Sequence, residues 1–286
     1  MTCSTQIHSG SLKKTFTQLQ KEIVECRICP RLVEHRERLA GEKRRAYRDW
    51  TYWGKPVPSL GDQSARLLIL GLAPAGHGAN RTGRMFTGDR SGDFLYGTLH
   101  RFEFCTQASS RDRQDGLRLQ DAYITAAIHC APPLNQPTRQ ELTDCRQYLR
   151  WELKLLNHVR VVVALGRIAW QAYWRARQEL QWHVPRPLPK FAHAMSYPLD
   201  EKTTLIASYH PSQQNTQTGR LTQEMFDRVF VQSVGLTQNA YAISPEVTIK
   251  TLLAKGKIDY FPSSVKPSLI GGNFKLYKEG PGYLWL

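Results

Sequence analysis

Short apolar runs alternate with longer segments of helical periodicity through most of the chain. The apolar runs lie at residues 66–71, 122–128, 159–165 and 203–208. Segments with helical spacing follow them, at residues 93–101, 139–157, 168–180 and 221–234. A short run without polar alternation is typical of a strand buried on both faces. The alternation predicts an α/β fold of three layers (α/β/α), in which helices cover a four-stranded parallel central sheet.

The two ends of the chain have a different texture. Leu12, Phe16, Leu19 and Ile23 are spaced as on one face of a helix, which predicts an amphipathic helix over residues 12–25. Pro30 is expected to stop or redirect the chain, and the polar residues 31–64 to form a long surface loop or a frayed helix.

Beyond about residue 235 the alternation is lost. The short segments 271–275 and 281–286 resemble β-hairpin or linker material. We therefore predict one domain over residues 1–235 and a tail of unassigned role over residues 236–286.

Composition and charge narrow the class of protein. The apolar share of 41% excludes wholesale disorder, and no apolar run approaches the roughly 20 residues of a membrane-spanning helix. The polar N-terminal residues carry no secretory signal, so we expect a soluble cytoplasmic protein. Thirty-nine Lys and Arg against 24 Asp and Glu give a net charge of +15, which favours a polyanionic partner such as nucleic acid.

Four of the six cysteines fall into two close pairs. Cys26 and Cys29 form a CxxC motif, and Cys145 follows Cys130 in a later segment. Without an export signal a disulfide framework is not expected, so the two pairs indicate a four-thiolate site for zinc or an iron–sulfur cluster. Cys3 and Cys105 lack such neighbours and are expected to be ordinary thiols.

Polar loops follow three of the four predicted strands, at residues 71–92, 129–137 and 209–215. In an open parallel sheet, ligands bind beyond the carboxyl ends of the strands. Three unusual loops at one edge of the sheet therefore predict a functional site there.

These loops carry sequences that resemble family 5 of the uracil-DNA glycosylase superfamily. The similarity covers roughly residues 15 to 230 and rests on four motifs: GLAPA…NRTGR…FTGDRSG, APPLNQP, HPSQQN…TGRLT, and the CxxC…C…C quartet. It implies a four-stranded parallel sheet between helices and removal of uracil, and often of other deaminated bases such as hypoxanthine or xanthine, from DNA. The partner is then DNA, and we expect a monomer with no membrane association.

The resemblance assigns catalytic roles to Asp89, Asn135 and His210. Asp89 would orient water and stabilise the sugar cation, and a neutral His210 would hydrogen-bond the departing base. Asn135 matches a family asparagine that is important for activity. Each residue also has an ordinary interpretation: Asp89 as a helix N-cap, Asn135 as a loop residue, and His210 as an incidental histidine.

Base binding is predicted for a further set of residues, with Phe86 against the face of the base and glycine allowing close backbone approach. The set comprises Gly71, Ala73, Ala75, Phe86, Ser212 and Asn215. Ala126 stands where the related family 4 carries an asparagine, so discrimination among bases should be relaxed. Phe86 could equally be a core aromatic, and the glycines a tight turn. Residues 213–220 are expected to enter the minor groove.

The resemblance also implies that Cys26, Cys29, Cys130 and Cys145 hold a [4Fe-4S] cluster, more structural than redox-active, although spacing alone leaves zinc open. Two other functions remain possible at this stage. One is a catalytically silent iron–sulfur module that only binds DNA, and the other is a family 4-like enzyme restricted to uracil.

Overall fold

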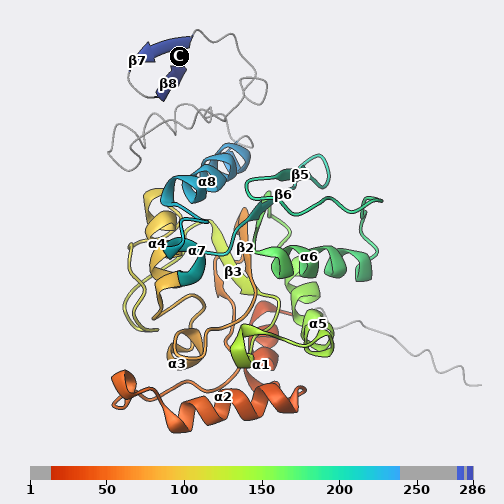
Figure 1. Ribbon diagram of the computed structural model, residues 1–286. Helices are drawn as coiled ribbons and strands as arrows, with labels where there is room; N and C mark the ends of the chain where they lie inside the picture. Colours follow the sequence, from red (N-terminus) through yellow and green to blue (C-terminus); the bar gives the residue numbers. More distant parts are fainter. Residues whose placement is uncertain (1–13, 239–275, 280–281, 286) are drawn as a thin grey trace, which may run out of the picture.

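The sheet at the centre of the molecule is larger than the sequence pattern indicates. The computed structural model describes residues 14–238, 276–279 and 282–285 (Figure 1). Its main sheet has six strands in the order β1-β3-β2-β4-β6-β5. Their bounds are β1 Leu60–Gly61, β2 Leu67–Gly71, β3 Ala122–Ala126, β4 Val161–Leu165, β5 Ser196–Pro198 and β6 Thr204–Ser208.

The four predicted strands are confirmed as the parallel centre of this sheet, where β3, β2, β4 and β6 are neighbours. The strands β1 and β5 are added antiparallel at the two edges. Both are only two or three residues long and partly exposed, so no apolar run marks them in the sequence.

The helices form a layer on each face of the sheet. Their bounds are α1 Phe16–Glu25, α2 Pro30–Glu42, α3 Ala79–Thr82, α4 Arg90–Arg101, α5 Arg139–Leu155, α6 Arg167–Glu179, α7 Gln213–Gln217 and α8 Gln223–Gln238. Successive residues of a strand point to opposite faces. Leu67 and Ile69 accordingly join the cluster that includes residues of α4 and α8, while Leu68 and Leu70 join that of α5 and α6. The predicted three-layer α/β/α architecture is therefore confirmed.

Residues 30–42 form helix α2, so the prediction of a loop or frayed helix from residue 31 was wrong for this part. Pro30 begins the helix instead of stopping the chain. Proline suits the first helical position because its fixed φ is already helical and its missing N–H would have no partner there. Leu32, Val33 and Arg36 are buried along this helix.

Helix caps explain where two other helices begin. Thr15 caps α1 and Thr138 caps α5, in each case with a reciprocal capping box. The first helix thus begins at Phe16, and Leu12 lies outside the described residues.

Towards the C-terminus, α8 continues past the predicted boundary at residue 235 to Gln238. Strand β7 (Leu276–Glu279) pairs antiparallel with β8 (Gly282–Trp285), as expected of a hairpin in the tail. Residues 271–275 of the tail lie outside the described part of the chain. Within the described residues, no helix has the length and apolarity to cross a membrane.

Candidate active site

Gly71 ends strand β2 at the carboxyl edge of the sheet, where its backbone meets the ring of Phe86. A Cβ built on Gly71 would lie 2.8 Å from Cζ of Phe86 and 3.0 Å from Cε2. Such contacts are closer than side chains tolerate, so glycine is required here. The ring of Phe86 therefore lies against the end of the strand, and close approach of a base to Gly71 stays a prediction.

His210 follows strand β6, and its imidazole lies beside Phe86 at the same edge. The two ring centroids are 6.0 Å apart and the ring planes differ by 28°. Ring centroids of aromatic pairs in contact lie about 4.5–7 Å apart, so the imidazole and the Phe86 ring are direct neighbours at this edge.

Phe86 itself adopts a backbone conformation that is unusual for a side chain of its size. Its φ is +51°, in the left-handed region, which costs roughly 1–2 kcal/mol for a residue other than glycine. The turn is tight enough that a Cβ on Gly92 would overlap the carbonyl oxygen of Phe86. Backbone strain of this kind persists only where the surrounding structure holds it.

A buried arginine holds the loop on either side of Phe86. Arg84 binds both carboxylate oxygens of Asp115, at 2.8 and 2.6 Å. Its Nε donates to the hydroxyl of Thr87 at 2.9 Å, and its Nη2 donates to Ser110 at 2.8 Å. Two residues that flank Phe86 are thereby fixed to the segment that contains Asp115.

Asp89 caps helix α4, as its ordinary interpretation proposes: Oδ1 accepts a hydrogen bond from the Gly92 N–H at 2.9 Å. Its other oxygen, Oδ2, lies against Gly78 in the loop after β2. Burial raises the pKa of Asp89, although the N–H groups of Gly92 and Ser91 oppose the rise. The cap therefore uses one oxygen and directs the other to the glycine-rich loop.

The turn that carries His210 is braced from within its own loop. The side-chain amide of Asn215 donates to the carbonyl of His210 at 2.8 Å, and the hydroxyl of Ser212 caps α7. Ser212 and Asn215 thus brace the turn, and the base binding predicted for them stays a prediction. Burial lowers the pKa of His210 to about 4, which keeps the imidazole neutral at pH 7.

Three further predicted site residues are Asn135, Ala73 and Ala75. Asn135 lies exposed on the short 3₁₀ turn η2 (Pro133–Asn135), with φ +57°. Ala73 and Ala75 are partly buried, and the carbonyl of Ala75 accepts the backbone N–H of Asn80 at 3.0 Å. The roles of these three residues stay predictions.

Sequence reasoning missed an arginine in the same loop region. Arg81 lies in α3, 3% exposed, with its guanidinium against the rings of Tyr47 and Trp50. Nearby, the Tyr52 hydroxyl lies 3.1 Å from Nδ1 of His77. The aromatic residues of segment 47–53 were visible in the sequence, but nothing there indicated that they pack on the loop after β2.

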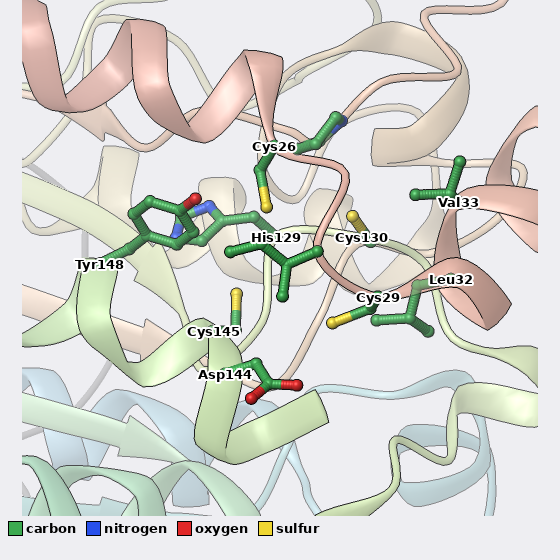
Figure 2. Close-up of a pocket in the computed structure, with 11 residues that line it drawn as sticks. Cys26, Cys29, Leu32, Val33, His129, Cys130, Asp144, Cys145 and Tyr148 are labelled. Carbon is green, nitrogen blue, oxygen red and sulfur yellow. The ribbon is translucent and has the colours of Figure 1, made fainter. Parts of the chain in front are cut away.

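The four paired cysteines line one pocket, although they come from separate parts of the chain (Figure 2). Cys26 ends α1, Cys29 precedes α2, Cys130 follows β3 and Cys145 lies within α5. Apolar side chains such as Ile28, Leu32 and Val33 complete the lining. All four are free thiols. Cys105 is buried elsewhere, where its Sγ donates to the carbonyl of Gln107 at 3.1 Å, and Cys3 lies outside the described residues.

The thiols lie among mostly apolar side chains, with Asp144 and His129 also in the lining. Burial raises the pKa of Cys29 to about 11 and that of Cys130 to about 12, with Arg36 opposing the rise at Cys130. In the part of the chain that the structure describes, no group of three or more His, Cys, Asp or Glu side chains converges so that it could hold a metal ion.

Comparison with known proteins shows the family to which the chain belongs. Residues 58–232 match the family model described as the uracil DNA glycosylase superfamily. The chain is 51% identical over 217 residues to the type-5 uracil-DNA glycosylase of Mycobacterium bovis, covering 76% of this chain and 80% of that protein. It is 49% identical to the type-5 enzyme of Thermus thermophilus, covering 74% and 93% of the two chains.

Similarity to type-4 enzymes is weaker. The type-4 uracil-DNA glycosylase of Archaeoglobus fulgidus is 30% identical over 157 residues, which is 54% of this chain and 70% of that protein. The fold and the loops thus define a protein of the uracil-DNA glycosylase superfamily. Within that superfamily, the chain belongs to the type-5 family.

Proposed function

We propose that this protein is a DNA-repair enzyme that hydrolyses the N-glycosidic bond of uracil in DNA and leaves an abasic site. The placement of Phe86 and the neutral His210 side by side at the carboxyl edge of the sheet carries the proposal, in combination with membership of the type-5 family. A flipped base can stack on the face of Phe86 with its edge towards the imidazole. In that position Phe86 would stack on the base and His210 would hydrogen-bond to it.

The neutral His210 supports departure of the base. When the glycosidic bond breaks, its electron pair moves to the base, and negative charge spreads to the base oxygens. An imidazole N–H directed at such an oxygen stabilises the charge as it develops. Because burial lowers the pKa of His210 to about 4, the group acts as a hydrogen-bond donor without first carrying a charge.

Asp89 supports the other half of the reaction. The sugar becomes cationic as the base leaves, and water then adds at C1′ and gives up a proton. A carboxylate beside this carbon stabilises the cation and orients the water. Oδ2 of Asp89 is the oxygen for this role, because Oδ1 already accepts the Gly92 N–H.

The test is single-turnover base release from a uracil-containing duplex by the full chain, with DNA binding measured in parallel. Wild-type protein should produce abasic sites, and Asp89→Asn should bind the duplex but react roughly 100-fold or more slowly. Binding without abasic product from the wild type would favour the silent DNA-binding module. An Asp89→Asn variant with the wild-type rate would remove Asp89 from the mechanism.

The proposed base range extends to hypoxanthine and xanthine. Ala126 ends β3 in register with Gly71, so its methyl group stands at the edge where the base would bind. A methyl group offers no hydrogen bond that selects one base edge over another. Comparable release of uracil and hypoxanthine is expected, whereas release of uracil alone would favour the restricted, type-4-like enzyme.

We also propose that the cysteine pocket holds a [4Fe-4S] cluster. Four cysteine thiolates can hold either a zinc ion or a four-iron cluster, and the similarity to family 5 favours the cluster. A four-iron cluster binds each thiolate on a different iron, which suits thiols spread around a shared pocket (Figure 2). Bound there, the cluster would tie α1 and α2 to the loop after β3 and to α5.

A buried cation beside the pocket supports an anionic group within it. Arg36 is 1% exposed, and its Nη2 donates to the carbonyl of Cys26 at 3.4 Å. Its carboxylate contact, with Glu37 at 3.6 Å, is long, and Glu37 is already paired with Arg27 at 2.6 Å. The Nε atom of Arg36 is buried without a partner among the described residues. A cluster of thiolates would balance this charge.

Iron content and the visible absorption spectrum of anaerobically purified protein test the cluster. About four irons per chain are expected for the wild type and for Cys105→Ser, a matched control whose buried thiol lies outside the pocket. Cys130→Ser should lose iron and colour. A wild type that is colourless and free of iron would contradict the proposal. The cytoplasmic location, the monomeric state and insertion of residues 213–220 into DNA stay predictions.

A further inference from the structure

Arg81 connects the two loops that meet at Asp89. Its Nε donates to the carbonyl of His77 at 2.8 Å, and its Nη2 donates to the carbonyl of Gly88 at 2.9 Å. His77 precedes the glycine against which the carboxylate lies, and Gly88 directly precedes Asp89. One side chain thus fixes the backbone on both sides of the carboxylate.

Aromatic rings hold the guanidinium of Arg81 where a buried arginine would ordinarily have a carboxylate. Its Cζ lies 3.9 Å from the ring centroid of Tyr47 and 4.1 Å from that of Trp50. Ring faces attract a cation without neutralising it. Among the described residues Arg81 forms no salt bridge, and its Nη1 is buried without a hydrogen-bond partner. Its positive charge therefore remains uncompensated at short range.

We propose that Arg81 is a positioning residue for hydrolysis, which holds the loop of Asp89 against the loop of Gly78 and places a positive charge near the Asp89 carboxylate. The proposal rests on the role proposed above for Asp89. The aromatic pair Tyr47 and Trp50 serves the same purpose indirectly, because it fixes the guanidinium without cancelling its charge.

The charged groups around Asp89 allow the proposal to be tested by pH. Burial raises the pKa of Asp89, N–H donation from Gly92 and Ser91 lowers it, and of the two charged neighbours Asp93 raises it and Arg81 lowers it. Loss of Arg81 leaves only the two N–H donors to oppose burial and Asp93, so the pKa of Asp89 rises. The ionised fraction of Asp89 then falls at any given pH, so the acidic limb of the rate profile should move to higher pH.

The experiment measures single-turnover release of uracil from a duplex between pH 4.5 and pH 9 by the full chain. Arg81→Met should move the acidic limb upward by about one pH unit, and Arg81→Lys should move it less because the charge is kept. Asp93→Asn should move the limb downward. Arg66→Met is the control, since Arg66 pairs with Asp121 at the opposite edge of the sheet and should leave the limb in place.

Circular dichroism at each pH identifies variants that unfold. If Arg81→Met does not fold, Trp50→Leu replaces it as the test, because Trp50 is 37% exposed and its removal leaves the arginine present. That variant should react about three- to tenfold more slowly with unchanged DNA affinity. A Trp50→Leu rate equal to the wild type would overturn the proposal.

The proposal for Arg81 would also be overturned if folded Arg81→Met kept the acidic limb of the wild-type pH–rate profile. Equal shifts of that limb in Arg81→Met and Arg81→Lys would overturn it too. Asp89→Asn distinguishes a failure of the role proposed for Arg81 from a failure of the role proposed for Asp89. If Asp89→Asn is inactive and the Arg81→Met limb is unmoved, the inference on Arg81 fails alone. If Asp89→Asn keeps the wild-type rate, the role proposed for Asp89 fails as well.

Discussion

The carboxylate of Asp89 occupies the space in which a side chain at Gly78 would lie. A Cβ built on Gly78 would overlap Oδ2 of Asp89 and approach its Cγ to 2.9 Å. The carboxylate and the glycine-rich loop are therefore packed as one unit, although eleven positions separate the two residues in the sequence. This contact decides where the free oxygen of Asp89 can stand.

Gly78→Ala should displace the Asp89 carboxylate and lower the single-turnover rate by roughly 100-fold, because misplacement of a reacting group by about 1 Å costs that much. DNA affinity should change little. Gly41→Ala in α2 is the matched control: its Cβ would meet nothing within 4 Å, and alanine is the better helix former. Equal rates for both alanine variants would show that Asp89 does not need this position.

His210→Gln should lower the rate of uracil release by roughly 100- to 1000-fold, the usual cost of losing a donor to a developing oxyanion. The Phe86 wall should remain, so binding of uracil-containing DNA is expected within a fewfold of wild type. The measurement is single-turnover release at pH 7.5 with binding in parallel. His193→Gln is a control histidine, since its ring contacts Tyr209 and the carbonyl of Met225.

The same histidine should make stability depend on pH. Burial lowers the pKa of His210 to about 4, below its ordinary value of 6.5, so the unfolded chain binds the proton more readily. Stability is then complete above about pH 6.5 and is lost as the pH falls towards 4. Between pH 7.5 and pH 5 this group should remove about 2 kcal/mol.

Urea unfolding at the two pH values measures this effect as the difference between wild type and His210→Gln. The variant should lose less stability on acidification, because glutamine does not titrate. An identical pH dependence in the two proteins would mean that His210 is not buried as the structure has it.

Arg84→Met should destabilise the fold by about 3 kcal/mol, because it leaves the carboxylate of Asp115 without its bidentate partner in a mostly buried place. Arg66→Met breaks a more exposed pair with Asp121 and should cost about 1 kcal/mol or less. Unfolding in urea at pH 7.5 compares the two variants. Similar losses would show that burial of the Arg84 pair contributes nothing extra.

Much of the fold follows from local pattern. The four parallel strands were predictable because each is buried on both faces and therefore appears as an unbroken apolar run. Helix α2 and the edge strands were not predictable in the same way. The edge strand β5 is short and partly exposed, and the polar surface of α2 hid a narrow buried stripe at Leu32, Val33 and Arg36.

The candidate site, like the fold, was predictable from the sequence only in part. Motifs directed attention to Asp89 and His210, and the structure places one against Gly78 and the other beside Phe86. Ser212 and Asn215 belong to the same motif, yet they brace the His210 turn. Arg81 lies within the NRTGR motif, but no role was predicted for it, because its partners Tyr47 and Trp50 come from a segment more than thirty positions earlier.

The sequence by itself determined the α/β class, the parallel centre of the sheet, the edge at which polar loops gather and the family. These depend on periodicity and on short motifs, which are local properties of a chain. The tertiary structure alone decided that Phe86 lies against Gly71 and that a cation held by aromatic rings stands near Asp89. Such contacts form where segments distant in the sequence pack together. They depend on the shape and burial of both partners, so residue spacing within one segment does not predict them.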